Sequence, residues 1–218
     1  MREVVAIDGP AGAGKTTVAK AVADALGWRY LDTGAMYRAV TALMLDRGFD
    51  PGNEEYAEEV ASGMKLFLQG DRILVNGSDM TRRIRHQDVT DAVPVVAAHP
   101  RVREQLLGLQ RRFADEGKAV IEGRDISAVV VPDAAVKVFL TASGAVRAAR
   151  RGEQLGLPGD DTTVALIESE LSERDRLDSS RDVSPLTQVD EAVVLDSSER
   201  SVEEIVAEIV TLVKKLRP

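Results

Sequence analysis

The residues from Gly9 to Thr16 constrain this chain more than any other stretch. Their sequence, Gly-Pro-Ala-Gly-Ala-Gly-Lys-Thr, fits the pattern G-x-x-x-x-G-K-[ST] of a phosphate-binding loop (P-loop). In such a loop, glycines permit a tight turn whose backbone N–H groups surround a polyphosphate. The pattern assigns Lys15 to the β- and γ-phosphates and the Thr16 hydroxyl to a Mg²⁺ ion.

The residues on either side of the loop have the pattern that it requires. Residues 4–7 form a short apolar run, which predicts a strand buried on both faces. Apolar residues then recur at helical spacing from Ala19 to Leu26, and Gly27 stands where a helix would end. A chance glycine-rich turn would lack this context, so we predict that the chain binds a nucleoside triphosphate. The residues assigned to it here are Gly9, Pro10, Ala11, Gly12, Ala13, Gly14, Lys15, Thr16 and Thr17.

Composition excludes several classes of protein. Hydrophobic residues make up 44% of the 218 residues and charged residues 29%, as in an ordinary soluble globular protein with one substantial core. No apolar run is long enough to span a membrane, and the first strand begins too early to leave room for a signal peptide. The absence of cysteine excludes thiol catalysis, and two histidines make a zinc site unexpected. We therefore expect a cytoplasmic protein.

The charge pattern indicates a small anionic substrate. The formal net charge of −8 argues against a nucleic-acid-binding surface. Arginine nevertheless outnumbers lysine and recurs in clusters at residues 82–85, 101–103, 147–151 and 174–181. Arginine suits bidentate recognition of phosphate, although some of these side chains could simply solvate helix faces.

Strand and helix patterns alternate along the chain. This alternation predicts a parallel sheet with helices on both faces, in which ligands bind at the carboxyl ends of the strands. Apolar runs predict strands at residues 4–7, 119–121, 136–140 and 192–195, and residues 28–31 form either a short strand or an extended segment. Residues 66–75 interrupt the alternation with two short strands joined at Gly70-Asp71, which predicts a hairpin in an inserted lobe. Residues 152–163, rich in glycine, predict a mobile loop.

Polar groups follow four of the predicted strands. They lie in the P-loop and in segments 32–33, 124–125 and 196–198. We expect the site at the first three of these segments.

Other P-loop classes lack their defining residues here. A regulatory GTPase needs the guanine-binding motif N-K-x-D, but neither Asn53 nor Asn76 is followed by lysine. An ATPase motor needs a further acidic strand end and a much longer chain. A small-molecule kinase fits, with a core, an acceptor-binding lobe and an arginine-bearing lid.

Four further motifs resemble those of the bacterial cytidylate kinases. They are Leu31-Asp-Thr-Gly-Ala-Met-Tyr-Arg38, Pro100-Arg-Val-Arg103, Glu122-Gly-Arg-Asp125, and Glu173-Arg-Asp followed by Asp178 and Arg181. The motifs occur in the family's order. The resemblance implies a single P-loop kinase domain over residues 1–218, with its core at 1–36, 116–146 and 164–218. It also implies an inserted CMP-binding lobe with a small antiparallel sheet at about 37–115 and a short lid at about 147–163.

The resemblance also implies roles for particular side chains. It assigns the acceptor nucleotide to Thr33, Tyr37, Arg38, Arg103, Arg124, Asp125, Arg174, Asp178 and Arg181. It assigns catalysis to Lys15, Arg124, Arg150 and Arg181, and the donor triphosphate also to the lid residues Arg147 and Arg151. Asp125 and Arg103 would read cytosine, whose N4 amine can donate to a carboxylate. Arg174 and Asp178 would lie at the sugar, while Arg38, Arg124 and Arg181 would hold the acceptor phosphate.

Simpler structural roles remain open for several of these residues. Arg174, Asp178 and Arg181 have the spacing of a surface salt-bridge ladder, and Asp125 could cap a strand end. Arg147 and Arg151 could solvate one face of a helix.

Two positions depart from the family's pattern. Pro94 stands where the family often has serine or another small polar residue near the base. Ser127-Ala128 replaces the usual Gly-Thr, which could alter the local turn.

The resemblance implies transfer of the γ-phosphoryl group of Mg·ATP to CMP and dCMP, giving CDP and ADP in pyrimidine nucleotide metabolism. The acceptor phosphate has a second pKa of about 6, so no general base is needed. A related kinase that also accepts UMP, and a nucleotide-binding regulator without catalysis, are the alternatives. We expect small nucleotides as the only partners, no nucleic acid or membrane, and a monomer.

Overall fold

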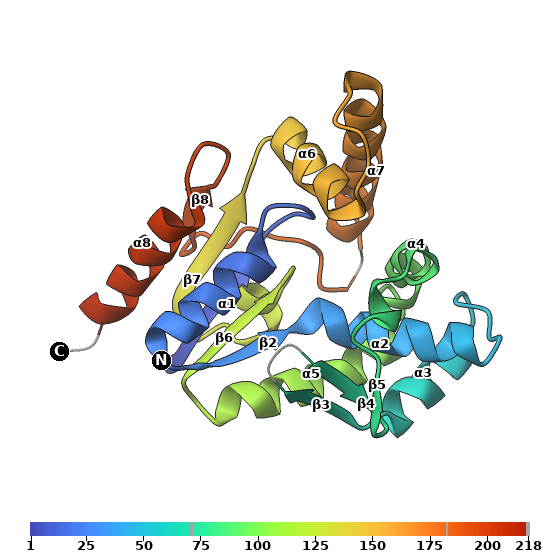
Figure 1. Cartoon of the computed structure of the whole chain (residues 1–218). Coiled ribbons are helices and arrows are strands. Elements are labelled where there is room, and N and C mark those ends of the chain that lie inside the picture. Colours follow the sequence, from blue (N-terminus) through green and yellow to red (C-terminus); the bar gives the residue numbers. More distant parts are fainter. Residues whose placement is uncertain (70–71, 182, 217–218) are drawn as a thin grey trace. The chain divides into compact units, whose positions relative to one another are not determined.

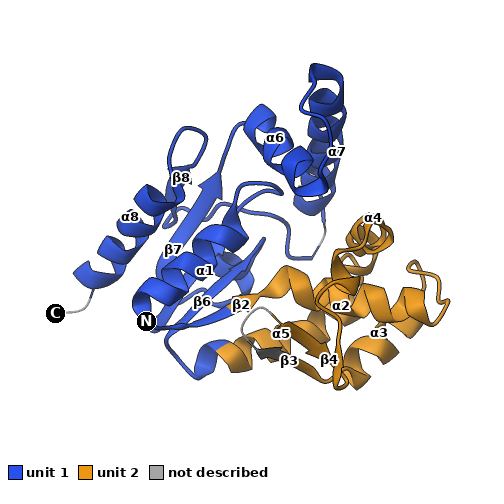
Figure 2. Cartoon of the chain, in the orientation of Figure 1, with its two compact units in different colours: residues 1–30, 114–218 blue, residues 31–113 orange. Residues whose placement is uncertain are grey.

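The computed structural model describes residues 1–69, 72–181 and 183–216. It divides into two compact units, which comprise residues 1–30 with 114–218 and residues 31–113 (Figure 2). Within the described ranges, none of the helices combines the length and the apolar character that crossing a bilayer requires.

The larger sheet has five strands in the order β2-β6-β1-β7-β8 (Figure 1). Their bounds are β1 (Arg2–Asp8), β2 (Arg29–Asp32), β6 (Ala119–Gly123), β7 (Ala134–Thr141) and β8 (Val193–Asp196). Strand β1 pairs in parallel with β6 and β7, and β7 pairs in parallel with β8. The predicted parallel sheet with flanking helices is therefore confirmed.

Strand β1 is buried on both faces, as its apolar run predicts. Val4, Val5, Ala6 and Ile7 are all 0% exposed, so residues pointing to either side of the sheet meet other elements. One face packs against α1 (Lys15–Leu26) and α8 (Val202–Lys215), whose buried residues belong to the same core cluster as Val5 and Ile7. Helix α8 begins with a capping box formed by Ser201 and Glu204.

The smaller unit contains the predicted hairpin. Strands β3 (Leu66–Gln69) and β4 (Arg72–Val75) pair antiparallel, and β4 pairs with the short β5 (Ser78–Asp79). The predicted Gly70-Asp71 turn lies outside the described residues. The helical elements here are α2 (Thr33–Asp46), α3 (Glu54–Gly63), the 3₁₀ turn η1 (Arg83–Arg85), α4 (Gln87–Val96) and α5 (Pro100–Asp115).

The loop predicted at residues 152–163 is shorter than expected. Helix α6 (Gly144–Leu155) continues past Gly152, and α7 (Asp161–Ser179) begins where the Asp160 side chain accepts from two backbone N–H groups. Gly152 lies inside α6 and not in a turn, and a Cβ there would lie 3.3 Å from Cδ1 of Ile167 in α7. The glycine instead permits α6 and α7 to pack closely, and Gly156, with φ of 65°, ends the helix.

The carboxyl ends of the strands meet at one edge of the sheet. Asp8 at the end of β1 is in register with Gly123 of β6 and with Phe139 of β7. Thr141 of β7 is in register with Asp196 of β8. The loops that follow these strands therefore emerge together, as ligand sites in parallel sheets require.

Substitution of Gly9 tests how closely the start of the P-loop packs against β7. Its φ is 148°, and a Cβ would lie 2.0 Å from the carbonyl oxygen of Leu140 in β7. We expect Gly9→Ala to lower the free energy of unfolding by at least about 2 kcal/mol, through backbone strain and overpacking. In a chain of this size that corresponds to a melting temperature lower by about 4–8 °C in a calorimetric scan.

Gly63→Ala is the matched control. Gly63 ends α3 and has open space around its Cβ position, so alanine there should be neutral or slightly stabilising. Equal melting temperatures for the two variants would contradict the packing described for Gly9.

Candidate active site

The P-loop connects β1 to α1 and is lined by neighbouring elements. Gly12 has φ of 76°, and a Cβ there would lie 3.0 Å from Cβ of Arg147 in α6. Only glycine permits so close an approach of α6. Gly14 is the N-cap of α1 and has no side chain with which to cap it. The N-terminus of a helix without such a cap favours an anion, because its first N–H groups can donate to one.

Lys15 lies at the start of α1 and is 8% exposed. Its Nζ donates to the carbonyl oxygens of Gly9 at 2.8 Å and Pro10 at 2.7 Å. Burial, and then the positive charge of Arg124, lower the pKa of Lys15 to about 7, while the charges of Glu122 and Asp175 oppose this effect.

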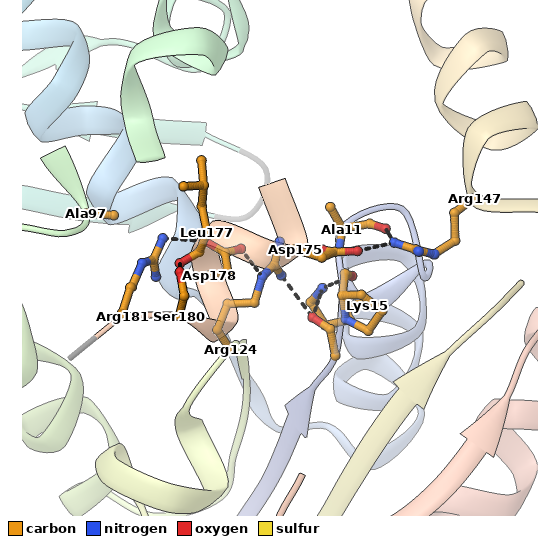
Figure 3. Close-up of polar contacts among 12 residues, drawn as sticks. Ala11, Lys15, Ala97, Arg124, Arg147, Asp175, Leu177, Asp178, Ser180 and Arg181 are labelled. Atoms are coloured by element: carbon orange, nitrogen blue, oxygen red, sulfur yellow. Dashed lines mark hydrogen bonds and ion pairs between the residues drawn. The ribbon is translucent and has the colours of Figure 1, made fainter. Parts of the chain in front are cut away.

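Arg124 follows β6 and joins the loop to α7 (Figure 3). Its Nη1 donates to the Gly9 carbonyl oxygen at 3.0 Å, and its Nε donates to Asp178 Oδ2 at 2.8 Å. The other Asp178 oxygen accepts from Arg181. Burial would raise the pKa of the Asp178 carboxyl, but the guanidinium groups of Arg124 and Arg181 hold it below its ordinary value.

This group of charges is not a surface ladder. The side chains of Asp178 and Arg181 are only 4% and 10% exposed, whereas exposed ladders are largely solvated. Arg174, on the same helix, is half-buried. Asp178 and Arg181 therefore form a buried ion pair and not a surface ladder.

Asp8 holds the turn that carries Arg124 and Asp125. Its carboxylate accepts from the backbone N–H groups of Ile126 and Ser127, both at 2.8 Å, at the start of the π-helical turn η2 (Ile126–Val130). Burial raises the pKa of the Asp8 carboxyl. Because Ser127 contributes its backbone N–H to this contact, the departure from glycine at that position leaves the contact intact. Asp125 is 7% exposed and directly precedes this turn.

Two of the three predicted lid arginines contact protein groups at the loop. Arg147 donates to the Ala11 carbonyl oxygen at 3.0 Å and pairs with Asp175. Arg150 donates to the Ser197 hydroxyl at 3.0 Å and to the Ser197 carbonyl oxygen at 2.7 Å. For Arg151, the described part of the chain offers no hydrogen bond or ion pair. Solvation of a helix face thus fits Arg151 and not Arg147, whose side chain is 12% exposed.

The segment after β8 also contacts the P-loop, in addition to the three strand ends at which we expect the site. Ser197 is 5% exposed, and its Oγ lies 3.2 Å from the Ala13 carbonyl oxygen and 3.0 Å from that of Thr141. Its small polar side chain fits under the loop and also accepts from Arg150. A polar residue directly after the last strand was the signal, but the sequence did not show which loop it meets.

Four of the predicted acceptor residues lie in the unit of residues 31–113. Thr33, buried at 4% exposure, begins α2, which also carries Tyr37 and Arg38. The Arg103 guanidinium lies 5.3 Å from the centre of the Tyr37 ring, a cation–π contact. Arg38 donates to the Thr90 hydroxyl at 2.9 Å.

Pro94 lies inside α4, one helical turn after Thr90. It has no N–H for the i−4 hydrogen bond of that helix. The departure from the family's pattern therefore changes the backbone hydrogen bonds of α4 as well as the side chain.

Asp8 and Asp175 are polar residues of the site that were not predicted. Asp175 accepts from the Ala11 backbone N–H at 2.9 Å. Asp175 is the third residue of the Glu173-Arg-Asp motif, and Asp8 directly precedes the P-loop. Their positions in or beside these motifs were the sequence signal that could have identified them as residues of the site. Buried Glu122 likewise accepts from the Tyr30 hydroxyl.

The donor set fits a Mg²⁺ ion held largely by its nucleotide. No group of three or more acidic, histidine or cysteine residues that could hold a metal occurs in the described ranges. Thr16, in the first turn of α1, offers one hydroxyl oxygen beside the loop. Mg²⁺ is commonly bound in this way, by one or two protein groups together with phosphate oxygens and water.

Solved structures share the fold at low sequence identity. A protein of Eubacterium ventriosum aligns with a TM-score of 0.55 and 14% identity over 99% of this chain and 99% of its own. A gluconokinase of Sinorhizobium meliloti aligns with a TM-score of 0.50 and 17% identity over 99% of this chain and 95% of its own. These similarities support the fold alone.

Curated relatives have a much higher sequence identity to this chain than these solved structures do. A cytidylate kinase of Oceanobacillus iheyensis is 43% identical over 208 residues, which cover 94% of this chain and 90% of that protein. A cytidylate kinase of Bacillus cereus is 44% identical over 213 residues, which cover 96% of this chain and 95% of that protein. The family model described as cytidylate kinase matches residues 5–215. The chain therefore belongs to the cytidylate kinase family.

Proposed function

We propose that the protein transfers the γ-phosphoryl group of Mg·ATP to CMP and dCMP, giving the nucleoside diphosphate and ADP. One observation carries this proposal beyond family membership. The P-loop lysine and the arginine assigned to the acceptor phosphate donate to the same oxygen, since Lys15 and Arg124 lie 2.8 Å and 3.0 Å from the Gly9 carbonyl oxygen. Cations for the donor and acceptor phosphates thus lie side by side.

The chemistry proposed requires positioning and charge neutralisation. An acceptor phosphate is already largely ionised near neutral pH, so its oxygen can attack without a general base. Arg124 and Arg181 would orient that phosphate, while Lys15 and the P-loop N–H groups would hold the donor. A bound Mg²⁺, held by Thr16 and the nucleotide, would neutralise charge on the β- and γ-phosphates.

Two regions take the remaining roles in this proposal. We assign residues of about 37–115 to the acceptor, with Thr33 beside them, and residues of about 147–163 to a lid over the donor. Asp125 accepts from the cytosine N4 amine, and Arg103 donates to the base. Arg174 and Asp178 bind the sugar. In uracil, a carbonyl oxygen replaces the N4 amine of cytosine. This oxygen would face the Asp125 carboxylate, so binding of uracil would be disfavoured.

Acceptor selectivity tests the proposal directly. With Mg·ATP, we expect ADP release in a coupled assay with CMP and dCMP, and much slower release with UMP, AMP and dTMP. Asp125→Ala should lower the preference for CMP over UMP by about tenfold or more, because one base-specific contact is lost. Asp24→Ala, an exposed carboxylate on α1, is the control and should retain the preference.

Other outcomes would favour the alternatives. Comparable rates with UMP would indicate that Pro94 accompanies a broader base site. ATP binding without ADP release for any acceptor would support a regulator and overturn the kinase proposal.

The two neighbouring arginines of α6 provide a second test. Arg150 donates to Ser197 beside the loop, whereas Arg151 has no hydrogen bond or ion pair within the described ranges. This difference supports assigning the neutralisation of transferring charge to Arg150. We expect Arg150→Ala to lower kcat by about 10³-fold, as for other phosphate-stabilising arginines. Arg151→Ala should cost less than about tenfold. Equal losses would contradict the assignment.

The lowered pKa of Lys15 gives the third test. Its charge is lost as the pH rises through about 7, while ATP is fully ionised above that value. Between pH 7.5 and 9 we expect ATP affinity to fall by up to about tenfold per pH unit, with proton uptake on binding. Isothermal titration calorimetry in two buffers of different ionisation enthalpy measures both quantities.

Lys15→Arg is the matched control for this pH dependence. The guanidinium stays charged throughout the range, so the affinity of this variant should be nearly independent of pH. Parallel curves for the two proteins would rule out Lys15 as the titrating group.

A further inference from the structure

The residue Ala11 of the P-loop is contacted by α6 and α7 in three ways. Its methyl group, at 6% exposure, packs in a small apolar cluster with Ala148 of α6 and with Ile167 and Leu171 of α7. Its N–H donates to Asp175 Oδ1 at 2.9 Å. Its carbonyl oxygen accepts from Arg147 at 3.0 Å, and Arg147 pairs with the other oxygen of Asp175 (Figure 3).

Three cations beside the loop donate to its own carbonyl oxygens. Lys15 donates to the carbonyl oxygens of Gly9 and Pro10, Arg124 donates to that of Gly9, and Arg147 donates to that of Ala11. The three consecutive carbonyl oxygens of residues 9–11 thus accept hydrogen bonds from the same lysine and arginines that we assign to phosphate binding. A lysine has three donors, so Lys15 cannot keep both carbonyl contacts and also bind two phosphate groups.

Asp175 differs from these carbonyl oxygens because its side chain is a carboxylate. Its carboxylate accepts a hydrogen bond from the backbone N–H of Ala11. Backbone N–H groups of a P-loop are the groups that bind an anion. Its side chain is 16% exposed, so water screens the charge only in part. A polyphosphate in the loop would therefore meet a neighbouring negative charge that also holds Arg147.

We propose that Asp175 is an internal anion of the donor site, which occupies the Ala11 end of the P-loop and competes with the donor's phosphates for Arg147 and the loop. This inference rests on the proposed binding of a polyphosphate donor. According to this inference, Asp175 weakens binding of the donor. In the protein without donor, it provides a counter-charge for Arg147. Asp178 pairs with Arg124 and Arg181 one helical turn later, so α7 supplies counter-charges to both groups of phosphate-binding arginines.

The test is the affinity for inorganic tripolyphosphate, measured by calorimetry without any nucleotide. Asp175→Asn keeps an oxygen for the Ala11 N–H and removes only the charge, so the loop's hydrogen bond can persist. We expect this variant to bind tripolyphosphate at least about fivefold more tightly than the natural chain. Titration at about pH 6 keeps Lys15 charged, which matters because Asp175 itself favours the charged form of Lys15.

Two further variants separate the charge from other effects. Asp175→Glu retains the charge and should bind tripolyphosphate within about twofold of the natural chain. Glu170→Gln removes an exposed carboxylate from the same helix and should also change affinity by less than about twofold, because distant exposed charges are screened. Circular dichroism melting confirms that each variant is folded.

The outcomes discriminate clearly. Tighter binding by Asp175→Asn alone supports the inference. Weaker or unchanged binding by a folded Asp175→Asn would overturn it and identify Asp175 as a support of the loop. Phosphoryl transfer to CMP is assayed separately, so failure of the proposed function would appear there without altering the tripolyphosphate result.

Discussion

The buried ammonium group of Lys15 is the interaction on which the site depends. A cation at 8% exposure costs free energy unless its lost water is replaced, and here the replacement comes from the backbone of the loop itself. The Gly9 carbonyl oxygen also accepts from Arg124, which brings a second cation to the same point. Two like charges so close require counter-charges, and the carboxylates of Asp175 and Asp178 on α7 provide them. The position of α7 is thus linked to the charge of the loop.

The sequence predicts the parts of the site that depend on local chemistry. The glycine spacing of the P-loop and the apolar run of β1 each follow from short-range geometry, and the structure confirms the loop between β1 and α1 and the burial of β1. The parallel sheet follows from the alternation of strand and helix patterns, and the antiparallel hairpin follows from two short apolar runs that interrupt this alternation. These features could be predicted because each is determined within about one strand or one helical turn.

The contacts that were missed join residues far apart in the chain. Asp175 meets Ala11 across 164 positions, and Asp8 meets Ser127 across 119 positions. A lone aspartate has the same local pattern whether it solvates a helix or caps a distant N–H, so spacing cannot distinguish the two. Gly152 was misjudged for the same reason, because its proximity to Ile167 depends on how α6 packs against α7.

Asp8 shows how the P-loop and Arg124 are held in fixed positions relative to each other. It is the last residue of β1, directly before Gly9, and its carboxylate fixes the N–H groups of Ile126 and Ser127. Arg124, just before that turn, returns to the Gly9 carbonyl oxygen. The two loops are therefore tied by side-chain contacts in both directions, in addition to the β1–β6 ladder.

Such a fixed arrangement matters for a reaction that uses no general base. When the attacking oxygen is already ionised, the rate depends on how well two phosphates are aligned and neutralised. A displacement of about 1 Å can cost about 10²-fold in rate. Burial raises the pKa of Asp8, which shows that placing a carboxylate there carries an energetic cost. That cost is offset by two backbone hydrogen bonds that align the loops, and the function proposed here depends on that alignment.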